Sequence, residues 1–240
     1  FQLNSFAFRH ALLKEIRKPS LLTIMKKLTF QIINKVEGIN VNMEEISPEL
    51  ARIHAHLCGD GSVFIFRTKA KDRNWSGGIG YYNNNQDLLD KFRADFSKLF
   101  GVKMKMRKNR EVSIRSVKRA KEFIEKFGKF SSREWRIHSS IKNSNKEIKL
   151  EWLKAFFEDE DYHEKRYNRL KTKSINHNGL KDAKELLDSI GIFSTLTGPN
   201  IDKTCYLTIP KFDMVKEFSD FVKVPIRKGQ TLKANTLINS

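Results

Sequence analysis

Two apolar stretches about a hundred residues apart share one design, in which small residues recur every four positions and a carboxylate follows at the end. They are residues 53–61, IHAHLCGDG, and residues 153–161, LKAFFEDED. Positions four apart share a helix face, so Ala55 with Gly59, and Ala155 with Asp159, mark stripes narrow enough for two helix backbones to approach closely. The pattern predicts a pair of helices packed against each other.

Asp60 and Glu160 are the carboxylates at the ends of these two predicted helices. A helix C-terminus carries a partial negative charge and unpaired carbonyl oxygens, so a carboxylate there costs about a few tenths of a kcal/mol or more. If the two ends meet, both penalties add. Hard cations between the carboxylates make the arrangement favourable, because carboxylate and carbonyl oxygens are the ligands that Mg²⁺ and Ca²⁺ prefer. The residues therefore favour a metal-dependent phosphoryl-transfer centre.

Both stretches resemble the LAGLIDADG motif of homing endonucleases, and two copies in one chain resemble the monomeric, pseudo-twofold members of that family. The first copy keeps the final Gly-Asp-Gly at residues 59–61, and the second keeps an aromatic pair and an acid at residues 156–158. The copies also depart from the motif. Cys58 stands where the family often has an acid, and Asp159 and Asp161 stand where small residues are usual.

The layout after each motif repeats as well: a basic hairpin, an amphipathic helix that ends before a glycine, two further strands and a last helix. The resemblance implies an α+β fold of two pseudo-symmetric αββαββα repeats, with antiparallel saddle-shaped sheets packed across two central motif helices. We expect a basic amphipathic N-terminal extension at 1–45, the first repeat at 46–141, and the second repeat at 142–240 with its linker and a short C-terminal tail. Ser144 and Glu147 are predicted to form a capping box at the start of the second motif helix.

Composition agrees with a nucleic-acid binder. The 240 residues include 46 Lys plus Arg against 28 Asp plus Glu, which gives a formal net charge of +18 and a pI near 9.9. Composition alone leaves membrane-surface and ribosomal roles open. No run of about 18 apolar residues indicates a membrane span, and the two cysteines have neither zinc nor disulfide spacing, so we expect a soluble cytoplasmic protein.

Basic residues alternate with apolar ones in several segments, as expected of strands with one basic face. For a single strand this can also be a solvated, edge-protecting face. Matching segments in both repeats favour a saddle that binds the phosphates of double-stranded DNA. The predicted DNA-binding residues are Arg67, Lys69, Lys71, Arg73, Lys103, Lys105, Arg107, Arg115, Lys165, Tyr167, Arg169, Lys171 and Lys173.

Asp60 and Glu160 are expected to bind one divalent cation each, aided by the backbone carbonyls of Gly59 and Asp159, so that water is activated and the leaving 3′ oxygen is stabilised. Mg²⁺ is the expected ion, with Mn²⁺ as a substitute and Ca²⁺ supporting binding without cleavage. Two alternatives stay open. Asp60 alone could simply end a helix, and the acids next to Glu160 leave the choice of the second ligand open.

The family often places a basic residue near the scissile phosphate, late in each half. The resemblance nominates Lys228 in the second half and, by the same spacing, Arg133 in the first, with solvated surface charge as the alternative for each. Asn85 and Asn176, at the ends of their strands, are expected to help order solvent around the metals.

Three functions follow from this reading. The leading one is metal-dependent, site-specific cleavage of double-stranded DNA at a long asymmetric target by a monomeric, intron-encoded or free-standing enzyme. The second is an RNA-binding maturase that assists intron splicing, with intron RNA as its partner. The third is a DNA-binding regulator that does not cleave.

Overall fold

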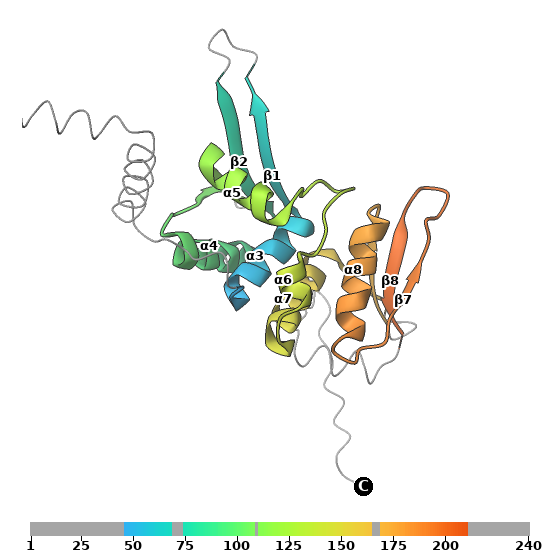
Figure 1. Cartoon of the computed structure of the whole chain (residues 1–240). Helices are drawn as coiled ribbons and strands as arrows, with labels where there is room; N and C mark the ends of the chain where they lie inside the picture. Colours follow the sequence, from blue (N-terminus) through green and yellow to red (C-terminus); the bar gives the residue numbers. More distant parts are fainter. Residues whose placement is uncertain (1–45, 69–73, 109, 165–168, 211–240) are drawn as a thin grey trace, which may run out of the picture.

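The computed structural model describes residues 46–68, 74–108, 110–164 and 169–210, and of residues 160–164 it describes only the backbone. The chain runs through these elements in the order shown in Figure 1. They are α3 (Pro48–Cys58), β1 (Gly61–Arg67), β2 (Trp75–Tyr82), α4 (Gln86–Phe100), β3 (Lys105–Arg107), β4 (Glu111–Arg115), α5 (Val117–Phe127), α6 (Ser139–Lys142), α7 (Lys146–Glu160), β5 (Asp161–Glu164), β6 (Arg169–Ser174), α8 (His177–Asp188), β7 (Thr195–Thr197) and β8 (Cys205–Ile209). The predicted extension at 1–45 and the segment after residue 210, with its predicted last helix, lie outside the described residues.

Two antiparallel sheets of the same topology confirm the repeat. The first has the strand order β1-β2-β4-β3 and the second has the order β5-β6-β8-β7. In the first half the elements α3 to α5 follow the predicted order αββαββα, and the second half follows it from α7 through β8. No helix in the part of the chain that the structure describes is long and apolar enough to cross a membrane.

The two motif helices begin with local side-chain caps. The Ser47 side chain accepts a hydrogen bond from the backbone N–H of Leu50, and Pro48 occupies the first turn, where its missing N–H costs nothing. For α7 the expected capping box was wrong. Asn145 accepts the bond from the N–H of Ile148 at 3.0 Å, whereas the Ser144 hydroxyl donates to the carbonyl of Ile141.

Helices α3 and α7 lie side by side at the centre of the molecule, as the small-residue stripes predicted (Figure 1). Ala55 and Ala155 are both fully buried in this contact region. At the end of α3 the approach is so close that a Cβ on Gly59 would lie 2.9 Å from Oδ2 of Asp159. The absence of a side chain at Gly59 is therefore what allows the two helix ends to meet.

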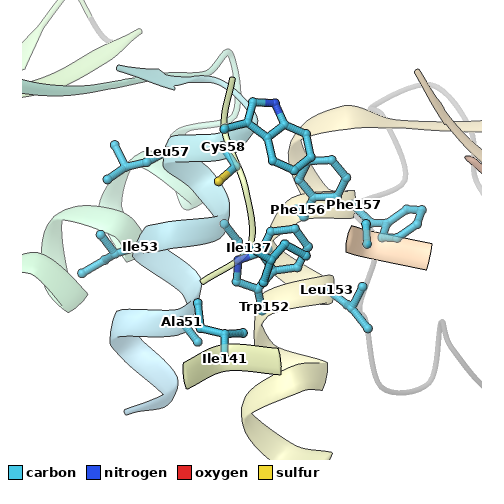
Figure 2. Packing of buried hydrophobic residues seen from close by; sticks show 14 of the residues in the cluster. Ala51, Ile53, Leu57, Cys58, Ile137, Ile141, Trp152, Leu153, Phe156 and Phe157 are labelled. Atoms are coloured by element: carbon cyan, nitrogen blue, oxygen red, sulfur yellow. The ribbon is translucent and has the colours of Figure 1, made fainter. Parts of the chain in front are cut away.

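The pseudo-symmetry is visible in the side chains of these helices. In Figure 2, Ile53 and Leu57 point from α3 away from α7, whereas Leu153 and Phe157 of α7 point away from α3. Each pair thus joins its central helix to the rest of its own half. All four residues belong to one continuous hydrophobic core.

A buried histidine forms a polar link between the two helices. The indole N–H of Trp152 donates to Nδ1 of His54 at 2.9 Å, and the thiol of Cys58 lies 3.5 Å from the same nitrogen. Burial lowers the pKa of His54 to about 3, so the ring is neutral and accepts this bond. A core role for this histidine fits the absence of metal-ligand spacing in the sequence.

The segment between the halves contacts the second half. Asp182 of α8 is almost fully buried and accepts bonds from both the Arg136 guanidinium, at 2.7 and 2.8 Å, and the Lys142 ammonium, as well as the N–H of Ile137 at 3.1 Å. Although burial opposes it, these donors hold the pKa of Asp182 below its usual value. Arg136 and Ile137, which the predicted boundary assigns to the first repeat, are thus bonded to α8 of the second half, whereas the ring of His138 lies against Phe127 of α5.

We predict that Gly59→Ala destabilises the protein by about 1–3 kcal/mol, because the new Cβ overlaps the fully buried side chain of Asp159. Urea unfolding monitored by circular dichroism measures the change. Gly80→Ala is the matched control, since the nearest atom to its Cβ would lie at an ordinary 3.4 Å. Equal stability of the two variants would show that the helices approach less closely than the structure indicates.

Candidate active site at the ends of the motif helices

Asp60 lies in the two-residue junction between α3 and β1, directly at the end of the first motif helix. Its backbone carbonyl accepts a hydrogen bond from the N–H of Tyr82 at 3.1 Å, so β2 fixes the backbone of this junction. Its carboxylate is partly exposed. The expectation that the first acid stands at a helix end beside the partner helix is confirmed in position.

Asp159 is the acid that the structure places against the end of α3. Its side chain is fully buried, and three donors from the first half hold it. The phenol of Tyr81 donates to Oδ1 at 2.6 Å, Nδ2 of Asn83 donates to Oδ1 at 3.2 Å, and Nδ1 of His56 donates to Oδ2 at 2.9 Å. A buried carboxylate is tolerated only with such partners. Asp159 therefore joins the second motif helix to β2 and α3 of the first half.

One amide bridges the two carboxylates. Nδ2 of Asn83 also lies 3.3 Å from Oδ2 of Asp60, so a single nitrogen contacts both acids. Burial and then the negative charge of Asp159 raise the pKa of Asp60 to about 6, and His56 opposes the rise. The metal-free site thus carries more negative charge than its surroundings neutralise, and a cation would relieve this repulsion.

Two side chains beside the acids, those of Tyr81 and Glu158, have raised pKa values. Burial, followed by the charge of Asp159, raises the pKa of the Tyr81 phenol, so it remains a hydrogen-bond donor. Burial also raises the pKa of Glu158, and Lys91, whose ammonium lies 3.9 Å away, opposes this rise. Among the side chains that the structure describes, no three of His, Cys, Asp or Glu gather closely enough to hold a metal ion by themselves.

The other predicted catalytic residues are placed less fully. Glu160 is the last residue of α7, next to Asp159, and its side chain is not described. Arg133 is exposed in the turn at residues 131–134 between α5 and α6. Lys228 lies outside the described residues. The carbonyls of Gly59 and Asp159 remain predicted ligands.

The structure gives Asn85 and Asn176 a structural role, and their expected part in ordering solvent around the metals stays a prediction. Each caps a helix: the Asn85 side chain accepts from the N–H of Asp87, and that of Asn176 accepts from the N–H of Gly179, both at 3.0 Å. Asn176 is also buried and donates to the carbonyl of Trp135 at 2.6 Å. In the structure, the amide that contacts Asp60 and Asp159 is that of Asn83.

Sequence reasoning missed His56, Tyr81 and Asn83. The signal for the last two was the hairpin register. Gly61 pairs with Tyr81, so the end of β2 must lie beside Asp60. With the register of the two strands known, residues 81–83 could have been placed beside Asp60. The sequence does not fix this register, because the connecting loop of the hairpin is longer than a tight turn.

The open face of the first sheet carries basic side chains as predicted. Lys103, Lys105 and Arg107 are exposed, and the residues between them point into the core. Strand register brings Lys105 and Arg107 to the same face as Arg115, with Glu111 opposite Arg107. The alternation therefore predicted the face correctly for β3.

Arg67 differs from this pattern. The register sets it on the same face as Val63 and Ile65, which pack toward the core, and its guanidinium lies 5.1 Å from the ring centroid of Trp75. Its strand position therefore does not bring it to the basic open face. Lys69, Lys71 and Arg73, in the same predicted row, lie outside the described residues.

The second sheet has a comparable basic face. Arg169, Lys171 and Lys173 alternate with the buried Leu170 and Thr172, and the Lys171 ammonium lies 4.0 Å from the ring centroid of Tyr206. The predicted Lys165 and Tyr167 lie outside the described residues.

Solved structures of similar fold give this arrangement a context. No model of a known protein family matches the sequence. Mesophilic variants of the homing endonuclease I-DmoI superpose with a TM-score of 0.55 at 17% identity, over 72% of this chain and 96% of theirs. I-DmoI in complex with DNA and Mn gives a TM-score of 0.56 at 17% identity, over 73% of this chain and 96% of that one.

The chain has the fold of I-DmoI. A variant of I-SmaMI is similar as well, with a TM-score of 0.51 at 10% identity over 75% of this chain and 86% of that one. The homing endonuclease fold confirms the architecture that the two motifs predicted. The similarity extends over nearly the whole length of I-DmoI.

We predict that Asp60→Asn stabilises the metal-free protein at neutral pH. The folded state holds the Asp60 proton up to about pH 6, whereas a free aspartate releases it near 3.8, so stability falls as pH rises through this window. The variant should gain on the order of 1–2 kcal/mol at pH 7, after allowance for solvent screening, and nothing at about pH 4.

Urea unfolding in a chelating buffer at a series of pH values measures this difference. Asp90→Asn is the control, because Asp90 is an exposed helix residue whose contacts with Gln86 and Arg93 lie at the surface. A gain that is the same at all pH values would contradict the electrostatic origin.

Proposed function

We propose that this protein is a site-specific endonuclease that cleaves double-stranded DNA with divalent metal ions. The observation that carries the proposal is the position of Asp60: an acid of raised pKa at the crossing of the motif helices, at the start of a sheet with an open basic face. I-DmoI, which has this fold, is described in complex with DNA and Mn, and in complex with DNA and Ca. These complexes support DNA and a divalent cation as the partners.

The residues present suit a hard cation. The carboxylate of Asp60 and the carbonyl of the preceding residue, Gly59, would be its oxygen donors, and the charge of Asp159 adds to the negative potential at Asp60. Glu160 would supply the equivalent donor from α7. We propose Mg²⁺ as the ion, with Mn²⁺ as a substitute and Ca²⁺ supporting binding without cleavage. Such an ion lowers the pKa of a bound water and stabilises charge on the reacting phosphate.

The chain's own residues have the following roles in this proposal. Asp60 and Glu160 act in their ionised form, one for each strand of the duplex. Asn83 orients Asp60, and Tyr81 and His56 fix Asp159 so that its charge stays next to Asp60. Lys228 and Arg133 would contact the phosphates near the cuts. Arg133 can stabilise phosphate charge but does not readily release a proton, so the two halves need not be equal.

The two halves in one chain favour a monomer that acts on an asymmetric target. An intracellular, intron-encoded enzyme is the proposed setting. Binding to intron RNA without cleavage, or to DNA as a regulator, would use the same basic faces but would not require the acid pair.

The experiment is cleavage of a plasmid that carries the host gene without the segment that encodes this protein, with Mg²⁺ or with a chelator. We predict linear product with Mg²⁺ only. Asp60→Asn and Glu160→Gln should each lower double-strand cleavage by about a hundredfold or more, since each removes a metal ligand.

Asp90→Asn controls for a general effect of removing a carboxylate. Nicked product from one acid variant but not the other would indicate unequal halves. Tight binding of the plasmid without any cut by the parent protein would refute the catalytic assignment.

A further inference from the structure

Two exposed phenylalanines lie on the open face of the first sheet. Phe64 and Phe66 of β1 are 37% and 50% exposed, whereas Val63 and Ile65 of the same strand face the core. Their rings are nearly parallel, at an interplanar angle of 23°, and their centroids are 5.9 Å apart. Two adjacent exposed aromatic rings on a strand are costly in water, so a partner that covers them is expected.

The Phe64 ring lies close to the neighbouring strand β2. Phe64 pairs directly with Gly78 of β2, and a Cβ on that glycine would lie 3.2 Å from the far end of the Phe64 ring. The Phe64 ring therefore leans across the neighbouring strand. Tyr82 covers Gly80 in the same way, since two of its ring-end atoms would lie 3.5 Å from a Cβ there. A side chain at Gly78 would crowd both the Phe64 ring and the Ile114 carbonyl oxygen, which would lie 2.6 Å from its Cβ, whereas a Cβ at Gly80 would make only ordinary contacts with Tyr82.

The partner of this face must be a polyanion with an apolar component. Lys105, Arg107 and Arg115 share the open face with the rings, two or three strands away. At about 4.8 Å per strand the two sets are about 10–15 Å apart, so one duplex about as wide as the sheet can contact both. The basic side chains can bind phosphates. The phenyl rings need an apolar partner instead, because they have no hydrogen-bond donor for phosphate or base oxygens.

We propose that Phe64 and Phe66, flanked by Tyr82, contact the methyl groups of thymines in the major groove of the half-site bound by the first half. The thymine C5-methyl is the apolar group that the major groove displays, and phenylalanine is suited to it. This inference rests on the proposed function, because it takes duplex DNA as the substrate. Phe64 and Phe66 would set sequence preference, in addition to the basic residues that bind phosphate.

Strand geometry gives the position of these thymines. Asp60 precedes β1, so Phe64 and Phe66 lie four and six residues beyond the acid along an extended strand. At about 3.3 Å per residue this is about 13 and 20 Å. At about 3.4 Å per base pair, the contacted thymines lie about four to six base pairs from the cut.

The rings suit a duplex better than a single strand. Sheet proteins that bind single strands stack separate bases on separate aromatic rings. Here the two phenyl rings already contact each other and present one continuous surface. Stacking of unpaired RNA bases is therefore the competing outcome of the test.

The test selects duplexes from a pool with a randomised segment, using the full chain with Ca²⁺, and then compares thymine with deoxyuridine, which lacks only the methyl group. The expected result is enrichment of thymine about four to six base pairs from the cut, and about three- to fivefold weaker binding for each methyl removed. In Phe64→Ala and Phe66→Ala the enrichment at the corresponding position should disappear, and thymine and deoxyuridine should bind equally. Phe66→Leu, which keeps an apolar surface, should retain part of the preference.

Phe193→Ala is the matched control, because Phe193 is an equally exposed phenylalanine that precedes β7 in the second half. It should leave the methyl effect in the first half-site unchanged, and thermal unfolding of each variant shows that the fold is retained. Equal binding of thymine and deoxyuridine by the parent chain, with duplexes still selected in Ca²⁺ and cut in Mg²⁺, would overturn this inference alone. Failure to select any duplex, with single-stranded RNA bound through Phe64 and Phe66 instead, would overturn the proposed function as well.

Discussion

The contact between the ends of α3 and α7 determines the rest of the structure. A missing side chain at Gly59 lets Asp159 enter the first half, where three donors hold it. Each donor comes from a different part of that half: His56 from α3, Tyr81 from β2, and Asn83 from the segment after β2. One buried carboxylate thereby fixes the relative position of two helices and a hairpin. The position of Asp60, which follows α3 directly, depends on this contact.

The same contact explains why the site is under electrostatic strain without a cation. Two carboxylates share one amide donor at a point that is partly removed from water. Hydrogen bonds satisfy Asp159 but leave Asp60 with little compensation, so the proton is retained to a higher pH than usual. Under the proposed function, this loss of stability would be recovered when a cation binds, as is common where function and stability compete.

The sequence predicted the fold better than it predicted the details of the site. Helical stripes such as Ala55 with Gly59, and the repeated order of elements, depend on periodicities that persist over many residues. The partners of Asp159 depend instead on hairpin register, and a shift of one residue exchanges the two faces of a strand. Register, which the sequence does not fix, is what places Arg67 on the face opposite Lys105 and Arg107. Likewise, only the structure shows that the side chains of Asn85 and Asn176 cap helices.

The bonds from Arg136 and Lys142 to Asp182 have a consequence for how the two halves are joined. The exposed stretch at residues 131–134 joins α5 to a segment that already belongs to the second half. The length of that stretch therefore does not determine the distance between the halves. The contact between α3 and α7 holds the two halves together directly, so a longer or shorter connection at residues 131–134 would leave that contact in place.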